Sequence, residues 1–131
     1  IRDMLGSCYL MTDQLEKAKS IAEYHTEIPS QIHLYTASRY LIALKSGDRE
    51  RVSQFLEHML ELDQSDWVNP SFISFIYFHL GEVELAKQHF LRAIEERDPG
   101  VLYCNVEPLW REFKEGLPIV QEKLKTLQLI A

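Results

Sequence analysis

The stretch that decides the fold runs from Trp67 to Pro99 and reads WVNPSFISFIYFHLGEVELAKQHFLRAIEERDP. It holds two apolar stripes with helical spacing, one made of Phe72, Ile73, Ile76, Tyr77 and Leu80, the other of Val83, Ala86, Phe90, Ala93 and Ile94. Asn69 and Pro70 are typical of the cap and first turn of a helix, and Gly81 is typical of a helix end. Neither helix can bury its stripe alone. The stretch therefore predicts a helix pair that packs against further helices.

The same pattern recurs at intervals of 34 residues. The aligned triplets are Tyr9, Ala43 and Tyr77; Asp13, Gly47 and Gly81; Ala18, Val52 and Ala86; and Ala22, Leu56 and Phe90. The alignment holds over two successive shifts without a gap. A period of 34 residues made of paired helices is typical of tetratricopeptide repeats. The sequence therefore predicts an array of helix–turn–helix repeats.

Residue types at these positions also resemble the tetratricopeptide family, with Leu5, Gly6, Tyr9 and Ala18 in the first copy and Tyr77, Ala86, Phe90, Ala93 and Pro99 in the third. In that family, small residues let the paired helices approach closely and aromatic residues fill the space between them. The resemblance implies an all-α fold, a right-handed α-solenoid of three helix-turn-helix repeats. We expect repeats at about 1–30, 31–66 and 67–99 and a capping segment over 100–131, all in one domain.

The capping segment divides at its prolines and glycines. We expect Val101–Cys104 to be extended chain packed over the last repeat, a short helix from Pro108 to Gly116, and a final helix that begins at Pro118. We expect its polar side chains to face water: Glu112, Lys114, Glu115, Gln121, Glu122, Lys123 and Lys125.

This tail resembles the end of repeat regions in bacterial signalling proteins, where such modules follow cyclase, kinase or winged-helix domains. The matching parts are Arg97-Asp98-Pro99, the apolar run 101–103, Glu107-Pro108 with Trp110, and the stretch 117–129. Because Ile1 already lies within the first expected helix, we interpret the chain as a fragment of a longer protein.

Charge and composition disfavour several classes of partner. The net charge of −6 argues against nucleic acid and against an anionic membrane surface. No apolar run approaches the ~20 residues that span a bilayer. Cys8 and Cys104 have no metal-binding spacing, and we expect Cys8 to be a buried reduced thiol in a cytoplasmic protein.

Motifs for chemistry are missing from the sequence. The five histidines form no ligand pair on one helix face, and there is no phosphate-binding glycine loop or nucleophile elbow. The acidic pairs fall near helix ends or on outer faces. We therefore expect no enzymatic activity, no metal and no cofactor.

Binding is expected on the concave side of the array, which the first helix of each repeat lines. By resemblance to the geometry of the tetratricopeptide family, the predicted partner-binding groove consists of Leu10, Met11, Leu34, Ala37, Leu41, Leu44, Lys45, Ser71, Phe75, Phe78 and His79. Lys45 is the only cation in this set, which argues against a clamp for a peptide carboxylate. Three occupants stay open: a peptide or helix of a partner, a missing N-terminal part of the chain, or a second copy. A further alternative is that these residues are core between repeats.

We therefore expect a non-catalytic protein–protein interaction module. The resemblance of the tail implies that it is the C-terminal repeat region of a bacterial signal-transduction or transcription-regulatory protein. The alternative is a homodimerisation element or an intramolecular scaffold that positions a neighbouring catalytic domain.

Overall fold

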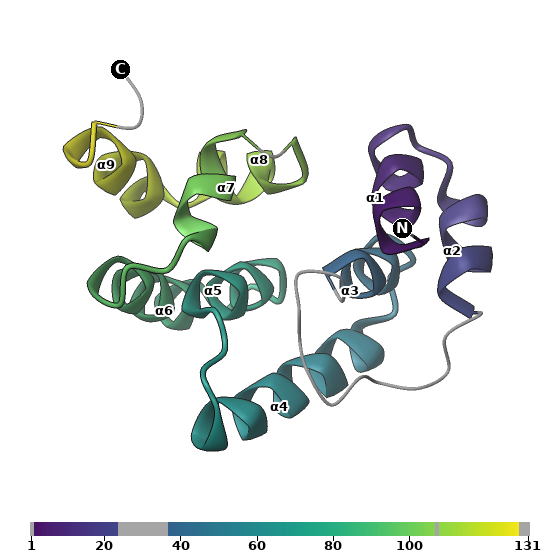
Figure 1. Cartoon of the computed structure of the whole chain (residues 1–131), viewed down its shortest axis with the longest axis horizontal. Helices are drawn as coiled ribbons and strands as arrows, with labels where there is room; N and C mark the ends of the chain where they lie inside the picture. The colour runs from purple at the N-terminus through teal and green to yellow at the C-terminus, as the bar shows by residue number, and fades with distance from the viewer. Residues whose placement is uncertain (1, 24–36, 107, 129–131) are drawn as a thin grey trace. The chain divides into compact units, whose positions relative to one another are not determined.

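The computed structural model describes residues 2–23, 37–106 and 108–128, and within these ranges all regular secondary structure is helical (Figure 1). The elements are α1 (Arg2–Met11), α2 (Leu15–Glu23), α3 (Ala37–Lys45), α4 (Arg49–Ser65), α5 (Pro70–His79), α6 (Val83–Glu95), α7 (Gly100–Val106), the 3-10 turn η2 (Pro108–Trp110), α8 (Arg111–Gly116) and α9 (Pro118–Thr126). The predicted all-α class is confirmed for this part of the chain. The chain forms two compact units, residues 1–59 and 60–131.

Three turns, between α1 and α2, α3 and α4, and α5 and α6, close with the same hydrogen bonds. The N–H groups of Gln14, Asp48 and Glu82 donate to the carbonyl groups of Tyr9, Ala43 and Tyr77, at 2.8, 3.0 and 2.9 Å. Successive donors are 34 residues apart in the sequence, and so are successive acceptors. The turns between the paired helices therefore follow the 34-residue spacing, and the same hydrogen bond also closes the end of α6, where Asp98 donates to Ala93 at 2.9 Å.

The residue before each of these donors has a left-handed backbone: φ is +55° at Asp13, +73° at Gly47 and +86° at Gly81. A left-handed residue ends a helix and turns the chain back for the next one. One turn into each following helix, Ala18, Val52 and Ala86 are fully buried. The predicted turns are thus found where the 34-residue spacing places them.

In the first unit, α1 contacts both α2 and α3. Its buried side chains include Leu10, Ala18, Tyr40 and Val52. The expectation that Cys8 is buried was wrong, because Cys8 lies about 160° around α1 from Leu10 and is exposed. The expected boundary between the first two repeats, near residue 30, lies outside the described residues.

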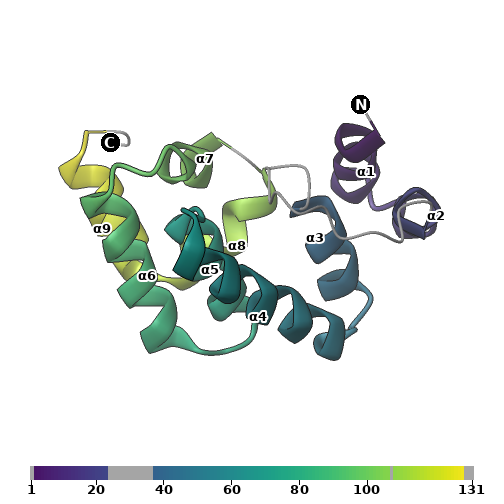
Figure 2. The same ribbon diagram turned by 60° about the horizontal axis from the view of Figure 1, so that its bottom comes forward.

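In the second unit, α5 and α6 form the most extensive helix pair (Figure 2). The α7 and α8 helices contact α5, and α9 packs on α8. The buried apolar side chains of this unit come from every helix from α5 to α9 and include Ile73, Phe75, Ile76, Phe90, Ala93, Val101, Trp110, Phe113, Leu117, Val120 and Leu124. The predicted short helix up to Gly116 and the final helix from Pro118 are confirmed.

One prediction in this unit was wrong: residues 101–104 belong to the helix α7 and are not extended chain. Val101 and Cys104 are buried on one side of it, three residues apart, which is a helical spacing. The apolar run has the length of a short strand, but Asp98 provides a cap that starts a helix. Its carboxylate accepts a hydrogen bond from the N–H of Gly100 at 2.7 Å.

The same carboxylate also caps α5. Asp98 is only 3% exposed and accepts a hydrogen bond from the N–H of Ser71 at 2.8 Å. Asn69, expected to cap α5 with its own side chain, makes no such bond. Its side-chain amide instead donates to Asp98 at 2.8 Å. Asp98 therefore serves the first turns of two helices.

Candidate protein-interaction surface

The predicted groove residues of the first unit divide between core and surface. Leu10 and Leu41 are buried, which agrees with the alternative that these residues are core between repeats. Their side chains belong to the core of the unit. Met11 and Lys45 are exposed and Leu44 is half-buried. Leu34 lies outside the described residues, and for Ala37 the structure describes the backbone alone.

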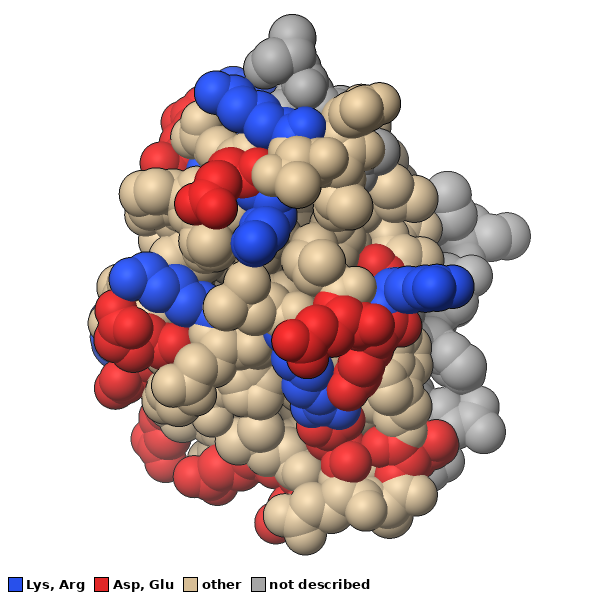
Figure 3. All heavy atoms as spheres, turned by 90° about the vertical axis from the view of Figure 1, so that its left-hand side faces the viewer, with Lys and Arg blue, Asp and Glu red and all other residues tan. Residues whose placement is uncertain are grey.

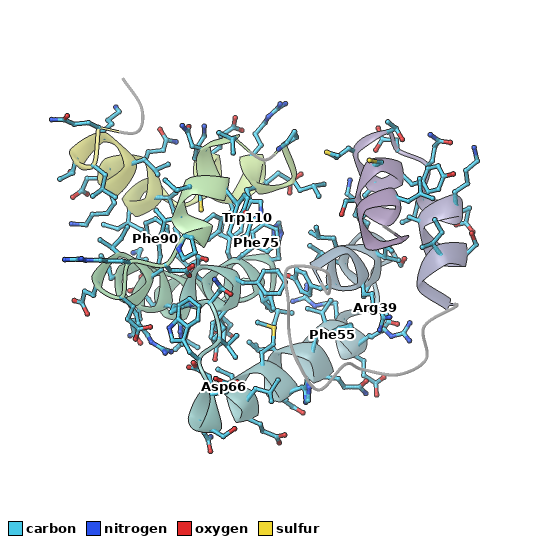
Figure 4. The ribbon with its side chains drawn as sticks, in the orientation of Figure 1. Arg39, Phe55, Asp66, Phe75, Phe90 and Trp110 are labelled. Atoms are coloured by element: carbon cyan, nitrogen blue, oxygen red, sulfur yellow. The ribbon has the colours of Figure 1, made fainter. Side chains whose placement is uncertain are left out.

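In the second unit, the predicted groove face of α5 is covered by η2 and α8. Phe75 is buried, with its ring centroid 4.4 Å from that of Trp110 and 5.8 Å from that of Phe113 (Figure 4). Phe78 packs edge-on against Phe113 at 5.6 Å, and Ser71 is buried as well. Ser71 and Phe75 are therefore core residues of this unit, as the alternative to an accessible groove expects. The cover comes from the chain's own C-terminal segment.

The close approach of α8 to α5 depends on a glycine at the end of α8. A Cβ atom placed at Gly116 would lie 2.5 Å from the tip of the Phe78 ring. Glycine leaves room there for the half-buried phenyl ring. Gly116 thus combines two roles, since it also ends α8 at the position expected from the sequence.

His79, the last predicted groove residue, lies at the edge of this aromatic cluster. Its ring centroid is 4.5 Å from that of Phe75 and 5.2 Å from that of Phe78. Its Nε2 atom is buried and has no hydrogen-bond partner among the described residues. Burial lowers the pKa of His79, although the negative charge of Glu112 opposes this shift. The imidazole is therefore a packed, neutral side chain at pH 7.

Charged side chains of the second unit are paired across the α4–α6 contact. Arg92 donates to both carboxylate oxygens of Asp63, one of them at 3.1 Å, and its Nε donates to Glu96 at 2.7 Å. Trp67 Nε1 donates to the other oxygen of Glu96 at 2.7 Å. The hydrogen bonds from Arg92 hold the pKa of Asp63 below its usual value. This network links the end of α4 to α6.

The outward side of α7 is apolar. Leu102 is 54% exposed, Tyr103 37% and Val106 73%. The helix itself contains no charged residue. Sequence reasoning missed this surface because it expected extended chain here. The available signal was the spacing of Val101 and Cys104, which leaves Leu102, Tyr103 and Val106 on the opposite side of a helix.

Other outward surfaces of the chain carry charges. Acidic and basic side chains lie next to one another on the face shown in Figure 3. No group of three or more His, Cys, Asp or Glu residues in the described ranges is arranged to hold a metal ion.

Among the described helices, none has the length and apolar character needed to cross a membrane. Burial raises the pKa of the Cys104 thiol to about 12.

Comparison with known proteins identifies no relative: no family model, no curated protein and no solved structure matches the chain.

Proposed function

We propose that this chain is a protein–protein interaction module of tetratricopeptide-like repeats, the C-terminal part of a cytoplasmic bacterial signalling or regulatory protein. The observation that supports the proposal most strongly is the recurrence of one turn geometry at 34-residue intervals. Gln14, Asp48 and Glu82 make equivalent hydrogen bonds, and each follows a left-handed residue. Repeats of this kind stack in one dimension and use the extended surface for binding.

The buried and exposed residues suggest which surface takes part. The α5 face is filled by α8, so binding there would require the aromatic cluster to open. The outward side of α7 needs no such rearrangement, since Leu102 and Val106 are already exposed. In the first unit, Met11 and Lys45 are accessible members of the predicted groove.

The test is capture of a partner by the chain and by three variants. A first variant, Leu102→Glu with Val106→Glu, alters α7, and a second, Met11→Glu with Lys45→Glu, alters the first unit. The matched control is Leu91→Glu, an exposed leucine on the outer side of α6. Each protein is cross-linked to its partners in a lysate of the cells that naturally contain the protein. The captured proteins are then quantified by mass spectrometry.

We expect a protein that wild type and the Leu91→Glu control capture equally and that at least one surface variant loses. Equal capture by all four proteins would contradict the proposal. The alternative function is self-association, and light scattering over a concentration series tests it. If the chain is a dimer and the same substitutions convert it to a monomer, self-association is the function.

A further inference from the structure

We infer that the outward side of α7, formed by Leu102, Tyr103 and Val106, binds a single basic amphipathic helix of a partner protein. This inference rests on the proposed function and names the chemistry of its partner. Three features of the second unit carry it: the arrangement of these side chains, the area they expose, and the net negative charge of the unit.

The three side chains form one continuous strip. At 100° per residue, Leu102, Val106 and Tyr103 fall within an arc of about 100° on α7. The opposite arc holds Gly100, Val101 and Cys104, all buried. Every side chain of α7 that is more than one-third exposed is thus large and apolar. Surface helices normally place polar residues on their outer side, so this outer side is suited to a contact.

Neighbouring helices of the same unit follow the normal pattern. The outer side of α6 carries Glu84 and Glu95, and that of α9 carries Glu122 and Lys125. Single exposed leucines such as Leu91 are scattered among such charges. The strip on α7 differs because its apolar side chains are adjacent and uninterrupted.

The size of the strip indicates what occupies it. Three side chains of these sizes, between about one-third and three-quarters exposed, present on the order of 300 Å² of apolar surface. A stable interface between two globular proteins buries about 800 Å² on each partner. A second copy of the chain docked on α7 alone would therefore be held weakly. One helix, with anchors at spacings of three and four residues, matches the strip better.

Charge indicates the character of that helix. Residues 60–131 contain twelve Asp and Glu against seven Lys and Arg, which places −5 of the chain's net charge of −6 in this unit. Because α7 itself is uncharged, none of these charges interrupts the strip. A helix with an apolar stripe flanked by Lys and Arg gains contact with the strip and attraction from the net negative charge of the unit.

The probe is a helical peptide of about 14 residues made of Leu and Lys, with Leu spaced for one apolar side. Two control peptides have Glu in place of every Lys, or the same composition in scrambled order. Binding to the full chain is measured by titration calorimetry at physiological salt, and the site is located by amide chemical-shift changes. We expect micromolar binding of the Leu–Lys peptide, with the largest shifts in residues 100–106, and at least about tenfold weaker binding of both controls.

Variants of the chain decide between contact and charge. Leu102→Glu with Val106→Glu adds negative charge, so binding by charge alone would become stronger. We expect it to become at least about tenfold weaker, while Leu91→Glu keeps the wild-type affinity. Circular dichroism checks that each variant is folded, and Leu102→Ser with Val106→Ser serves if the Glu variant is not.

Four results would overturn the inference: no binding of the Leu–Lys peptide, equal binding of the Leu–Glu peptide, equal binding of the scrambled peptide, or binding that the α7 substitutions leave unchanged. A dimer that Val106→Glu splits would also overturn it, because the occupant would then be a second copy. If the peptide fails but partner capture still depends on Met11 and Lys45, the proposed function stands and only the inference about α7 fails.

Discussion

The carboxylate of Asp98 accepts a hydrogen bond from the backbone N–H of Ser71 at 2.8 Å, across 27 residues of sequence. Asp98 lies three residues beyond the end of α6, and Ser71 lies in the first turn of α5. The same carboxylate accepts the N–H of Gly100 at the start of α7. One buried side chain therefore ties the first turns of α5 and α7 together. Two helix N-termini point their positive dipole ends at it.

Asp98→Ala should destabilise the second unit more than the loss of an ordinary cap. A cap contributes about 1 kcal/mol, and Asp98 caps two helices and accepts an amide N–H of Asn69 as well. We expect the free energy of unfolding to fall by about 2–3 kcal/mol, measured by urea denaturation. Asp48→Ala is the matched control, because Asp48 is an exposed single cap that accepts the N–H of Arg51. Equal losses in the two variants would refute the double role.

Gly100→Ala should destabilise the second unit, because the added Cβ atom would lie too close to the side chain of Ser71. A Cβ atom at residue 100 would lie 2.1 Å from Ser71 Oγ and 3.0 Å from Asp98 Oδ1. Such overpacking costs about 1–3 kcal/mol of the free energy of unfolding. Removing the obstructing side chain should recover part of it, so Ser71→Gly combined with Gly100→Ala should be more stable than the two single losses predict. Additive losses in thermal unfolding would argue against the clash.

The sequence predicts the helix pairs and their turns because both depend on local spacing. The positions of Asp13, Gly47 and Gly81 follow from the 34-residue period, and each has the left-handed backbone that ends a helix. The start of α7 was also readable, since Asp98-Pro99 resembles Asn69-Pro70 as a cap followed by proline. The shortness of the apolar run 101–104 favoured extended chain instead.

The candidate site was harder to predict, because burial depends on contacts far apart in the sequence. Phe75 and Phe78 have the spacing of groove residues, yet Trp110 and Phe113 of the C-terminal segment cover them. Periodicity places a side chain on one side of a helix, but it does not say which other helix covers that side. The exposed strip on α7 exists because residues 100–106 are helical, which places Leu102, Tyr103 and Val106 on one side.

The coupling free energy between Arg92 and Asp63 should be larger than that of an ion pair on the exposed surface. Asp63 is largely shielded and receives two hydrogen bonds from the guanidinium. A double-mutant cycle with Arg92→Met and Asp63→Asn should give a coupling free energy of about 1–2 kcal/mol. The control cycle uses Lys87 and Glu84, an exposed pair three residues apart, for which we expect less than about 0.5 kcal/mol. Similar couplings in the two cycles would show that shielding adds nothing.

His79 should make the second unit less stable in mild acid. Burial lowers its pKa in the folded state from the ordinary value of 6.5. As the pH falls below about 6.5, the unfolded state takes up a proton that the folded state still excludes, so the free energy of unfolding decreases. The decrease stops below the folded-state pKa.

Phenylalanine at position 79 keeps the aromatic packing and removes the titration. The loss of stability between pH 7.5 and pH 5.5 should therefore be smaller in His79→Phe than in wild type, by up to about 1 kcal/mol. Urea midpoints at the two pH values give the comparison. Wild-type and variant profiles that run parallel would mean that His79 protonates as easily in the folded chain as in the unfolded one.

The three equivalent turns should respond to substitution in opposite directions, according to the residue now present. Gly47 and Gly81 have positive φ and open space where a Cβ atom would lie. Alanine at either position would therefore clash with no other residue, and its only cost would be the left-handed backbone conformation. We expect each Gly→Ala change to lower the free energy of unfolding by about 1 kcal/mol.

Asp13 has the same left-handed backbone without being glycine, so Asp13→Gly should stabilise the first unit by about 0.5–1 kcal/mol. Asparagine tolerates this backbone better than alanine, and Gly47→Asn and Gly81→Asn should lose less than the alanine variants. Denaturation of all five variants provides the comparison. If Ala and Asn were equally costly, or Asp13→Gly were destabilising, the three turns would not share the backbone constraint that their 34-residue spacing implies.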